Sequence, residues 1–377
     1  MPILLSIFYF FYFSIVGVYL IFLPKVLSGL GYSASEIGIL FSAGPLVRFI
    51  LPFLFMKGLE LNRKIFNIAL LILVLSATAF YFSIYDFYKL LFLNIMLGVG
   101  MSLILPYVEV ISLQTIGKER YGKVRLFGSV GFILVALVLV KLLSSPYTAL
   151  YFLLTLSFIT ALVAFVIARQ VNKKETRTQE KIGNDINILK DWKLWSGLVL
   201  MQMSFGAFYN FFTIYVTNHG IDMDMTIYLW SFGVCIEILM LFFQGVLLKG
   251  NLLFILQLTT LVTALRWFIV YIAPDNLIAL FFSQSIHALS FALFHSAAIS
   301  YLYNLYKHKS LAQQFFSGIT YGLGGLSGAL ISGYIYEWYP EYLFLSSAFM
   351  AFGAFVFVSL WSKDEGRRES LGRAQNS

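Results

Sequence analysis

The chain has 377 residues, of which 60% are hydrophobic and 12% are charged, and its formal net charge is +8. Average soluble proteins contain about 45–50% apolar and about 25% charged residues. The apolar excess extends from Met1 to Trp361, which excludes a water-soluble globular protein and indicates a chain embedded in lipid. The 39 Phe and 23 Tyr agree with aromatic belts at the membrane interfaces.

Twelve apolar stretches are each long enough to cross a bilayer core of about 30 Å, which needs roughly 20 helical residues. The sequence therefore predicts an all-α membrane protein with twelve transmembrane helices. In chain order, the expected spans are 4–26, 36–56, 65–84, 89–112, 124–143, 148–168, 194–216, 226–248, 252–272, 277–304, 312–336 and 342–361.

A polar stretch at 169–193 separates the first six spans from the last six. Its composition cannot build a hydrophobic core, so we expect a cytoplasmic linker between two pseudo-symmetric six-helix bundles. These bundles are expected at 1–168 and 194–361, with a cytoplasmic tail at 362–377. The halves also repeat weakly at an offset of 189 residues, as parallel repeats do in two-bundle transporters. The matched pairs are Gly17 with Gly206, Phe22 with Phe211, Gly31 with Gly220, Ser42 with Ser231, Gly44 with Gly233, and Arg48 with Glu237.

The distribution of Lys and Arg predicts the orientation. If the N-terminus is cytoplasmic, the cytoplasmic loops, linker and tail hold 20 of them, whereas the outer loops hold only Lys25, Lys89 and Lys141. The positive-inside rule then places both termini in the cytoplasm, as expected for a multi-pass protein of the inner (plasma) membrane. The same rule accounts for the net positive charge, so no nucleic-acid partner is expected.

Seven titratable residues fall inside or at the edge of the expected spans, and such residues are usually functional because a charge at mid-bilayer costs several kcal/mol. They come from six different spans, so we expect them to converge on a central cavity. Structural ion pairing between helices stays an alternative. No cofactor is expected, and the eight-residue spacing of the two histidines is poor for metal binding. The residues are Arg48, Glu109, Arg125, Glu237, Arg266, His287 and His295.

Two motifs in the first half carry a family resemblance. YGKVRLFGSVGF at 121–132 looks like the start of helix five of lactose permease, and PYVE at 106–109 is similar to a motif of its helix four. The chain resembles the major facilitator superfamily, and within it the phenylpropionate-permease-like branch related to lactose permease, which comprises proton symporters. The resemblance implies that Arg125 binds substrate and that Glu109 is its partner.

Three motifs in the second half extend the resemblance: YLWSFGVCIE at 228–237, ALRW at 264–267 and HALSFALFH at 287–295. They imply that Glu237, Arg266 and His287 form a proton-linked cluster. His295 in the last motif, and Arg48 in the first half, are similar to the phenylpropionate branch.

The sequence departs from lactose permease at informative positions. Ser290 stands where that protein has a proton-carrying Glu, and Phe205 and Gln284 stand where it has a charge pair. Phe132 replaces the Trp that stacks on the sugar. Lactose is therefore not expected as the substrate, and we expect proton coupling through a different carrier, with Glu237 the first candidate.

We expect a secondary active transporter, a proton-coupled symporter that imports a small organic solute by alternating access and acts as a monomer. An aromatic carboxylate such as phenylpropionate suits Arg125 by charge-assisted pairing, whereas a sugar suits the Glu109–Arg125 pair through its hydroxyls. A nucleoside carrier or an exporter of the same fold stays an alternative. An enzyme or an ATP-driven permease subunit is disfavoured, because no catalytic constellation and no P-loop stand out. The expected substrate-binding residues are Glu109, Arg125, Phe132, Arg48 and His295, and the expected proton-coupling residues are Glu237, Arg266 and His287.

Overall fold

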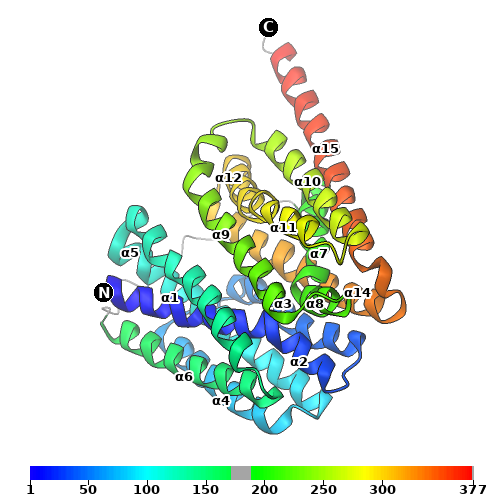
Figure 1. Cartoon of the computed structure of the whole chain (residues 1–377). Helices are drawn as coiled ribbons and strands as arrows, with labels where there is room; N and C mark the ends of the chain where they lie inside the picture. Colours follow the sequence, from blue (N-terminus) through cyan, green and yellow to red (C-terminus); the bar gives the residue numbers. More distant parts are fainter. Residues whose placement is uncertain (171–187, 376–377) are drawn as a thin grey trace.

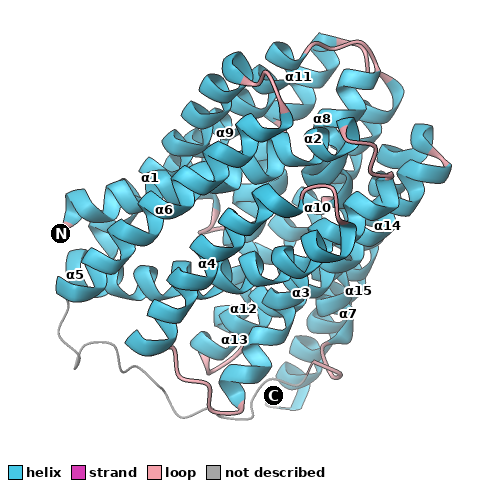
Figure 2. Ribbon diagram, turned by 90° about the horizontal axis from the view of Figure 1, so that it is seen from below, coloured by secondary structure: helices cyan, strands magenta, loops and turns pink. Residues whose placement is uncertain are grey.

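The computed structural model describes residues 1–170 and 188–375, and every secondary-structure element within these ranges is a helix (Figure 2). Eleven helical segments of this described part are long and apolar enough to cross a membrane. The expected all-α membrane fold is therefore confirmed. Most of the expected linker at 169–193 lies outside the described residues, so its cytoplasmic placement stays a prediction.

The N-terminal half contains six spans, as expected. The first is one continuous helix in which a π-helical turn joins two α-helices. The fourth and fifth, Phe87–Gly117 and Arg120–Leu142, join into the single element α5, where Gly117 takes a φ of 73° that glycine adopts at low cost. The elements are α1 (Pro2–Gly17), η1 (Val18–Phe22), α2 (Leu23–Gly29), α3 (Ala34–Met56), α4 (Arg63–Ser83), α5 (Phe87–Leu142) and α6 (Pro146–Gln170).

The C-terminal half also follows the expected order. The span expected at 312–336 is helical throughout but is not among the eleven most apolar segments, because it contains six glycines. The last helix continues through most of the expected tail at 362–377. The elements are α7 (Trp192–Ser204), α8 (Gly206–Asn218), α9 (Met223–Leu247), α10 (Leu252–Ile272), α11 (Leu277–Ser285), η2 (Ala288–Leu293), α12 (Phe294–Leu305), α13 (Lys309–Phe315), η3 (Phe316–Gly324), α14 (Gly325–Trp338), η4 (Pro340–Tyr342) and α15 (Leu343–Gln375).

The 189-residue repeat has a structural counterpart. Gly31 and Gly220 end the first span of each half with nearly equal φ angles of 91° and 89°. This left-handed conformation strains residues that carry a Cβ, so the glycine is required at both positions. Two further pairs at the same offset cap the helices that follow: Ser33 with Asp222, and Asn62 with Asn251.

Large apolar side chains are exposed on the surface, as a protein solvated by lipid requires. Phe82 is 80% exposed, Phe243 is 71% exposed and Ile278 is 83% exposed. In water, apolar exposure at this scale would favour aggregation or association. These side chains instead fit the hydrocarbon of a bilayer.

The two halves meet at the end of the molecule away from both chain termini, which we call the closed end. Figure 1 shows α2, α8 and α14 gathered there. Small residues four apart on α3, Ala34 and Gly38, face small residues four apart on α14, Ala329 and Gly333. A Cβ added at Gly38 would lie 2.6 Å from the Ala329 carbonyl oxygen, so the two backbones are in direct contact.

Among the described residues, Lys25, Glu337 and Lys141 make polar contacts that join the halves at the closed end. The Lys25 ammonium donates to the Thr217 hydroxyl over 2.9 Å, and a Glu337 carboxylate oxygen accepts from the backbone N–H of Ser35 over 2.7 Å. The third contact is an ion pair between Lys141 and Asp224, with 2.8 Å between nitrogen and oxygen. The Glu337 carboxylate sits at the N-terminal end of α3, where the helix dipole favours a negative charge.

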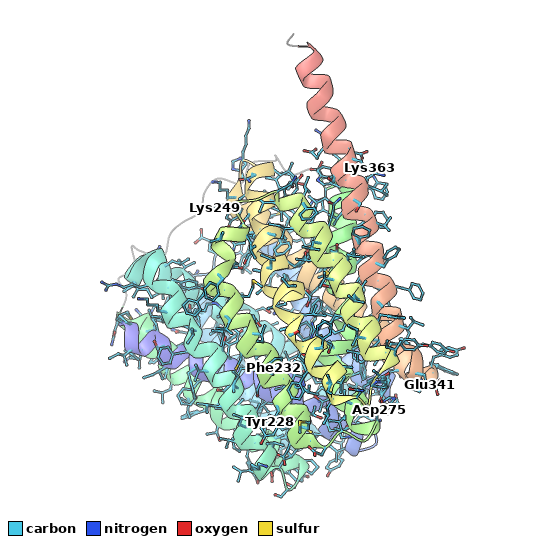
Figure 3. All side chains as sticks on the ribbon, turned by 45° about the horizontal axis from the view of Figure 1, so that its top comes forward. Tyr228, Phe232, Lys249, Asp275, Glu341 and Lys363 are labelled. Carbon is cyan, nitrogen blue, oxygen red and sulfur yellow. The ribbon has the colours of Figure 1, made fainter. Side chains whose placement is uncertain are left out.

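Charges are distributed unequally between the ends of the C-terminal half. Figure 3 shows Lys249 and Lys363 at the end that carries the C-terminus, and Asp275 and Glu341 at the other end. This arrangement agrees with the sequence-based orientation, in which the basic end faces the cytoplasm.

Candidate functional site

A cavity of about 3390 Å³ lies between the two halves and is lined by residues from both. Residues 58–62, which connect α3 to α4, line it, as does His308 between α12 and α13. The cavity therefore opens at the end opposite to the closed end. Its lining has twice as many basic as acidic residues, so it is electropositive and suits an anion. The charged lining residues are Arg48, Arg63, Lys64, Lys123, Arg125 and Lys309, with Glu60, Glu109 and Glu237.

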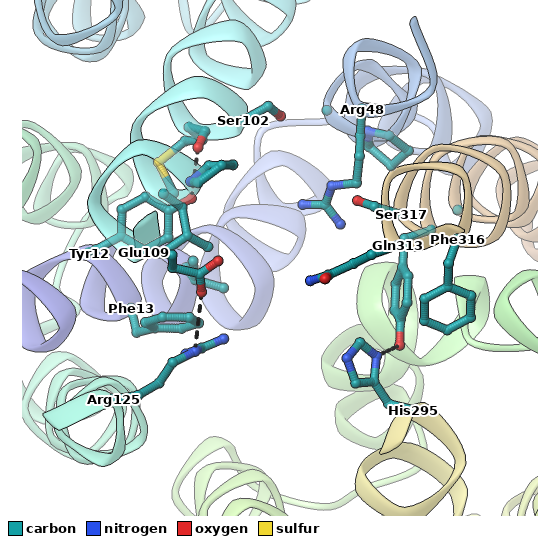
Figure 4. A pocket seen from close by; sticks show the side chains of 18 of the residues that line it. Tyr12, Phe13, Arg48, Ser102, Glu109, Arg125, His295, Gln313, Phe316 and Ser317 are labelled. Atoms are coloured by element: carbon teal, nitrogen blue, oxygen red, sulfur yellow. Dashed lines mark hydrogen bonds and ion pairs between the residues drawn. The ribbon is translucent and has the colours of Figure 1, made fainter. Parts of the chain in front are cut away.

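Glu109 and Arg125 form an ion pair on the wall of the N-terminal half (Figure 4), with 3.3 Å between the Arg125 Nε and a Glu109 carboxylate oxygen. The turn at Gly117 brings them together, because it folds the two spans of α5 back on each other. The Tyr121 hydroxyl donates to the same Glu109 oxygen over 2.9 Å. The guanidinium also lies 4.6 Å from the centre of the Phe13 ring, a cation–π contact. The charge of Arg125 is therefore balanced by Glu109, and one face of its guanidinium is covered by the Phe13 ring.

A second cluster lies in the C-terminal half around Arg266, whose residue is fully buried. Its guanidinium donates to Nδ1 of His287 over 2.9 Å, to the Ser290 hydroxyl over 3.1 Å and to the Gln284 side-chain oxygen over 3.1 Å. No carboxylate of the described residues lies within ion-pair distance of this guanidinium. Ser290 and Gln284, two of the departures from lactose permease, are therefore direct partners of Arg266.

The hydrogen bonds of His287 define its protonation state in this arrangement. A guanidinium has only donors, so Nδ1 of His287 must accept from Arg266 and carry no proton. The other ring nitrogen, Nε2, then bears the hydrogen and faces a Glu237 carboxylate oxygen at 3.5 Å. A chain of contacts therefore runs from Arg266 through a neutral His287 to Glu237, and we call this chain the relay.

Arg266 itself does not line the cavity. It lies behind His287, with its guanidinium 4.2 Å from the Trp267 ring centre and 4.6 Å from the Phe208 ring centre. Glu237 and His287 do line the cavity. Glu237, Arg266 and His287 lie together, and their predicted link to protons stays a prediction. A solute in the cavity reaches Arg266 only through its neighbours.

The two histidines share a helix face, as their spacing predicted. The His287 and Phe291 rings are stacked with their centres 5.4 Å apart, and the His295 ring follows at 6.5 Å from Phe291. His295 Nδ1 lies 2.6 Å from the Tyr321 hydroxyl (Figure 4). His295 is therefore held at the cavity wall by a residue from η3.

Phe132 is 9% exposed and faces Trp230, with ring centres 6.3 Å apart. These rings come from α5 and α9, so the contact crosses between the halves. Only a small part of Phe132 is available to a solute in this conformation.

Arg48 extends from α3 into the cavity (Figure 4). It makes no hydrogen bond or ion pair with any residue of the described ranges. Arg48 therefore differs from Arg125, which is neutralised by Glu109, and from Arg266, whose two terminal nitrogens donate to neutral partners.

The sequence missed several residues that shape the cavity. Tyr121 stands in the motif at 121–132, but the motif does not by itself predict the bond of its hydroxyl to Glu109. Phe13 and Tyr321 carry no distinguishing signal, because Phe and Tyr are abundant along the whole chain. Their roles depend on contacts between spans that are distant in sequence.

A cavity between two six-helix halves, closed at one end and lined by intramembrane charges, defines a membrane transporter rather than an enzyme. The model of the MFS_1 like family matches residues 3–346, and the chain belongs to this family. The resemblance to major facilitator transporters is thereby confirmed.

Two relatives of similar sequence are named as transporters, which supports the assignment of this chain to the transporters. The "Probable 3-phenylpropionic acid transporter" of Escherichia coli (strain K12) is 26% identical over 365 residues, which cover 93% of this chain and 95% of the relative. The "Uncharacterized transporter YwbF" of Bacillus subtilis (strain 168) is 24% identical over 335 residues, which cover 85% of this chain and 82% of the relative.

Solved structures agree on the fold. The nucleoside transporter NupG superposes with a TM-score of 0.78 at 18% identity, over 96% of this chain and 98% of that chain. A bacterial homolog of the human lysosomal transporter Spinster, in an inward-facing and occupied conformation, gives a TM-score of 0.73 at 12% identity, over 96% of both chains. At these identities, the likeness concerns the fold alone.

Proposed function

We propose that the protein is a proton-coupled symporter that imports a small organic anion, an aromatic carboxylate, by alternating access. The observation that carries the proposal is the electropositive cavity between the halves, open at one end and closed at the other. With both termini in the cytoplasm of a plasma-membrane protein, this arrangement corresponds to an inward-facing state. The printed name of the Escherichia coli relative supports a carboxylate of the phenylpropionate type.

The relay of Glu237, His287 and Arg266 supports a link between protons and conformation. If His287 takes up a proton, both ring nitrogens become donors and its bond to Arg266 is lost. If Glu237 takes up a proton, the charge that faces His287 disappears. These residues belong to or adjoin α9, α10 and η2, so either event changes the contacts that hold three helices together. A proton can thereby bias the equilibrium between the two access states.

A sugar or a nucleoside is the second candidate substrate. Glu109 and Arg125 line the cavity as an acceptor and a donor side by side, which suits hydroxyl groups. Transport of a neutral solute would use this pair and leave Arg48 without a counter-charge. Export instead of import is the alternative direction for either substrate class.

The test is solute uptake by proteoliposomes without nucleotide, against a panel of aromatic acids, sugars and nucleosides, with an imposed pH gradient. We expect saturable accumulation of an aromatic acid. One pH unit corresponds to 1.36 kcal/mol, so electroneutral one-to-one symport supports about tenfold accumulation. Accumulation of a sugar or nucleoside but of no carboxylate would establish the second candidate.

Glu237→Gln tests the proton role. A carrier that cannot release its proton still exchanges solute across the membrane, because exchange needs no net proton transfer. We expect retained counterflow and lost gradient-driven accumulation, while Glu60→Gln, which removes a carboxylate at the cavity mouth, keeps both. Loss of both activities in Glu237→Gln would make Glu237 a solute-binding residue. Retention of both would remove Glu237 from the mechanism and leave His287 as the candidate carrier.

A further inference from the structure

The charges deep in the cavity are unequally compensated. Arg48 and Arg125 are the cavity-lining cations that lie within the expected spans, whereas the other basic lining residues stand at span ends near the open mouth. Arg125 is paired with Glu109 and covered by Phe13. Arg48 has neither a carboxylate nor a hydrogen-bond partner among the described residues. Among the described residues, Arg48 is therefore the cation in the interior of the cavity that has no counter-charge, whereas Glu237, the interior carboxylate of the other half, faces the neutral His287.

The surroundings of Arg48 add further donors from the opposite half. Figure 4 shows the Arg48 side chain pointing into the cavity, with Ser317 and Gln313 on the same side and the Glu109–Arg125 pair across from them. The Gln313 side-chain oxygen accepts from the Tyr303 hydroxyl over 2.5 Å, which leaves the Gln313 amide hydrogens free to donate. The Ser317 hydroxyl also has no partner in the described part of the chain. A guanidinium, an amide and a hydroxyl thus present donors to the same region.

Close helix packing brings these groups together. A Cβ added at Gly322 would lie 2.6 Å from the Phe49 Cα atom, and one added at Gly318 would lie 2.7 Å from Pro52. The glycines of η3 therefore contact the turns of α3 that flank Arg48. Only this close approach lets residues of α13 and η3 share a ligand with a residue of the N-terminal half.

We propose that Arg48 is the anchor for the carboxylate of a monoanionic substrate, with Ser317 and Gln313 as donors from the opposite half. The inference rests on the proposed transport function and names the site and charge class of its substrate. A planar guanidinium binds a carboxylate through two parallel charge-assisted hydrogen bonds. One uncompensated cation matches one negative charge, since a dicarboxylate would need to take Arg125 from Glu109. The bound anion connects the two halves, so its binding favours conformations in which α3 and η3 are in contact.

The test is equilibrium binding to purified protein with two probes of the same shape, 3-phenylpropionate and its neutral amide. The wild-type protein is expected to prefer the acid. Arg48→Gln is expected to weaken binding of the acid tenfold to a hundredfold and leave the amide unchanged, which abolishes the preference. The control variant Arg63→Gln removes a positive charge at the cavity mouth and is expected to keep the preference for the acid. Benzylsuccinate, a dicarboxylate, is expected to bind more weakly than 3-phenylpropionate.

The outcomes separate this inference from the proposed function. If Arg48→Gln keeps the preference for the acid while Arg125→Gln loses it, the anchor is Arg125 and the present inference is wrong, although the transporter still carries an anion. If the wild-type protein binds no aromatic acid of the panel, the proposed substrate class fails, and the inference fails with it. If Arg48→Gln does not fold, Arg48→Lys serves instead, because it keeps the charge and loses the planar fork. That variant is expected to lose affinity for the acid only, and an unchanged affinity would overturn the inference.

Discussion

Gly38→Ala is a direct test of how the closed end is sealed. An added Cβ would lie 2.6 Å from the Ala329 carbonyl oxygen and 3.0 Å from the Gly333 Cα atom, whereas ordinary contacts are 3.4–4 Å. Both neighbours are backbone atoms of α14, which cannot rotate away. The substitution therefore forces the two halves apart at this point or displaces a helix.

The size of the effect follows from the cost of overpacking, which is typically 1–3 kcal/mol. The cost applies only to conformations in which the closed end is closed. It shifts the equilibrium roughly fivefold to a hundredfold toward conformations open at that end, since about 1.4 kcal/mol is a factor of ten. Alanine also favours the helix over glycine by about 1 kcal/mol, so general unfolding is not expected.

The assay is the distance between spin labels on opposite halves near the closed end, at Tyr88 and Tyr342, which are 81% and 50% exposed. Cys235, the single cysteine, is exposed and is replaced first. In Gly38→Ala the population with the longer distance is expected to grow. Gly29→Ala is the matched control, because a Cβ there meets no atom within 4 Å. An unchanged distance distribution in Gly38→Ala would refute the idea that this small-residue crossing seals the closed end.

Three further predictions concern binding, surface charge and topology. Arg125→Lys keeps the charge but loses the planar fork, so we expect solute binding at least tenfold weaker; normal transport by this variant would make Arg125 a point charge only. Lys141→Ala breaks the ion pair between Lys141 and Asp224, whose side chains are 62% and 46% exposed, so thermal unfolding should report only a small loss of stability that shrinks with added salt; a large, salt-independent loss would contradict this reasoning. Protease added to oriented vesicles should cut first within 169–193 and only from the cytoplasmic side, and cleavage from outside would overturn the orientation.

The sequence by itself determined the class of protein and the order of its helices. A lipid environment leaves no water for backbone groups, and a helix of about 20 apolar residues crosses it with all of these groups bonded within one segment. This requirement is local, and the twelve stretches could be located one at a time. The expected span at 252–272 coincides with α10. The span at 312–336 was found although its glycines make it less apolar than the others.

Part of the site could also be predicted, because residues in motifs carry information about their partners. The pairing of Glu109 with Arg125 was implied by the family resemblance and is present in the structure. The meeting of Glu237 with His287 was implied in the same way. In both cases the prediction concerned which residues meet, and the functions of these residues stay proposals.

Only the tertiary structure decided which charges are compensated and which end of the cavity is open. Arg48, Arg125 and Arg266 look alike in the sequence as arginines in apolar helices. Their differences arise from the rotation of each helix about its axis and from the contacts between the two halves. Arg125 faces a carboxylate, Arg266 is buried among neutral partners, and Arg48 faces the open cavity. Such differences depend on packing between distant spans, which local composition does not encode.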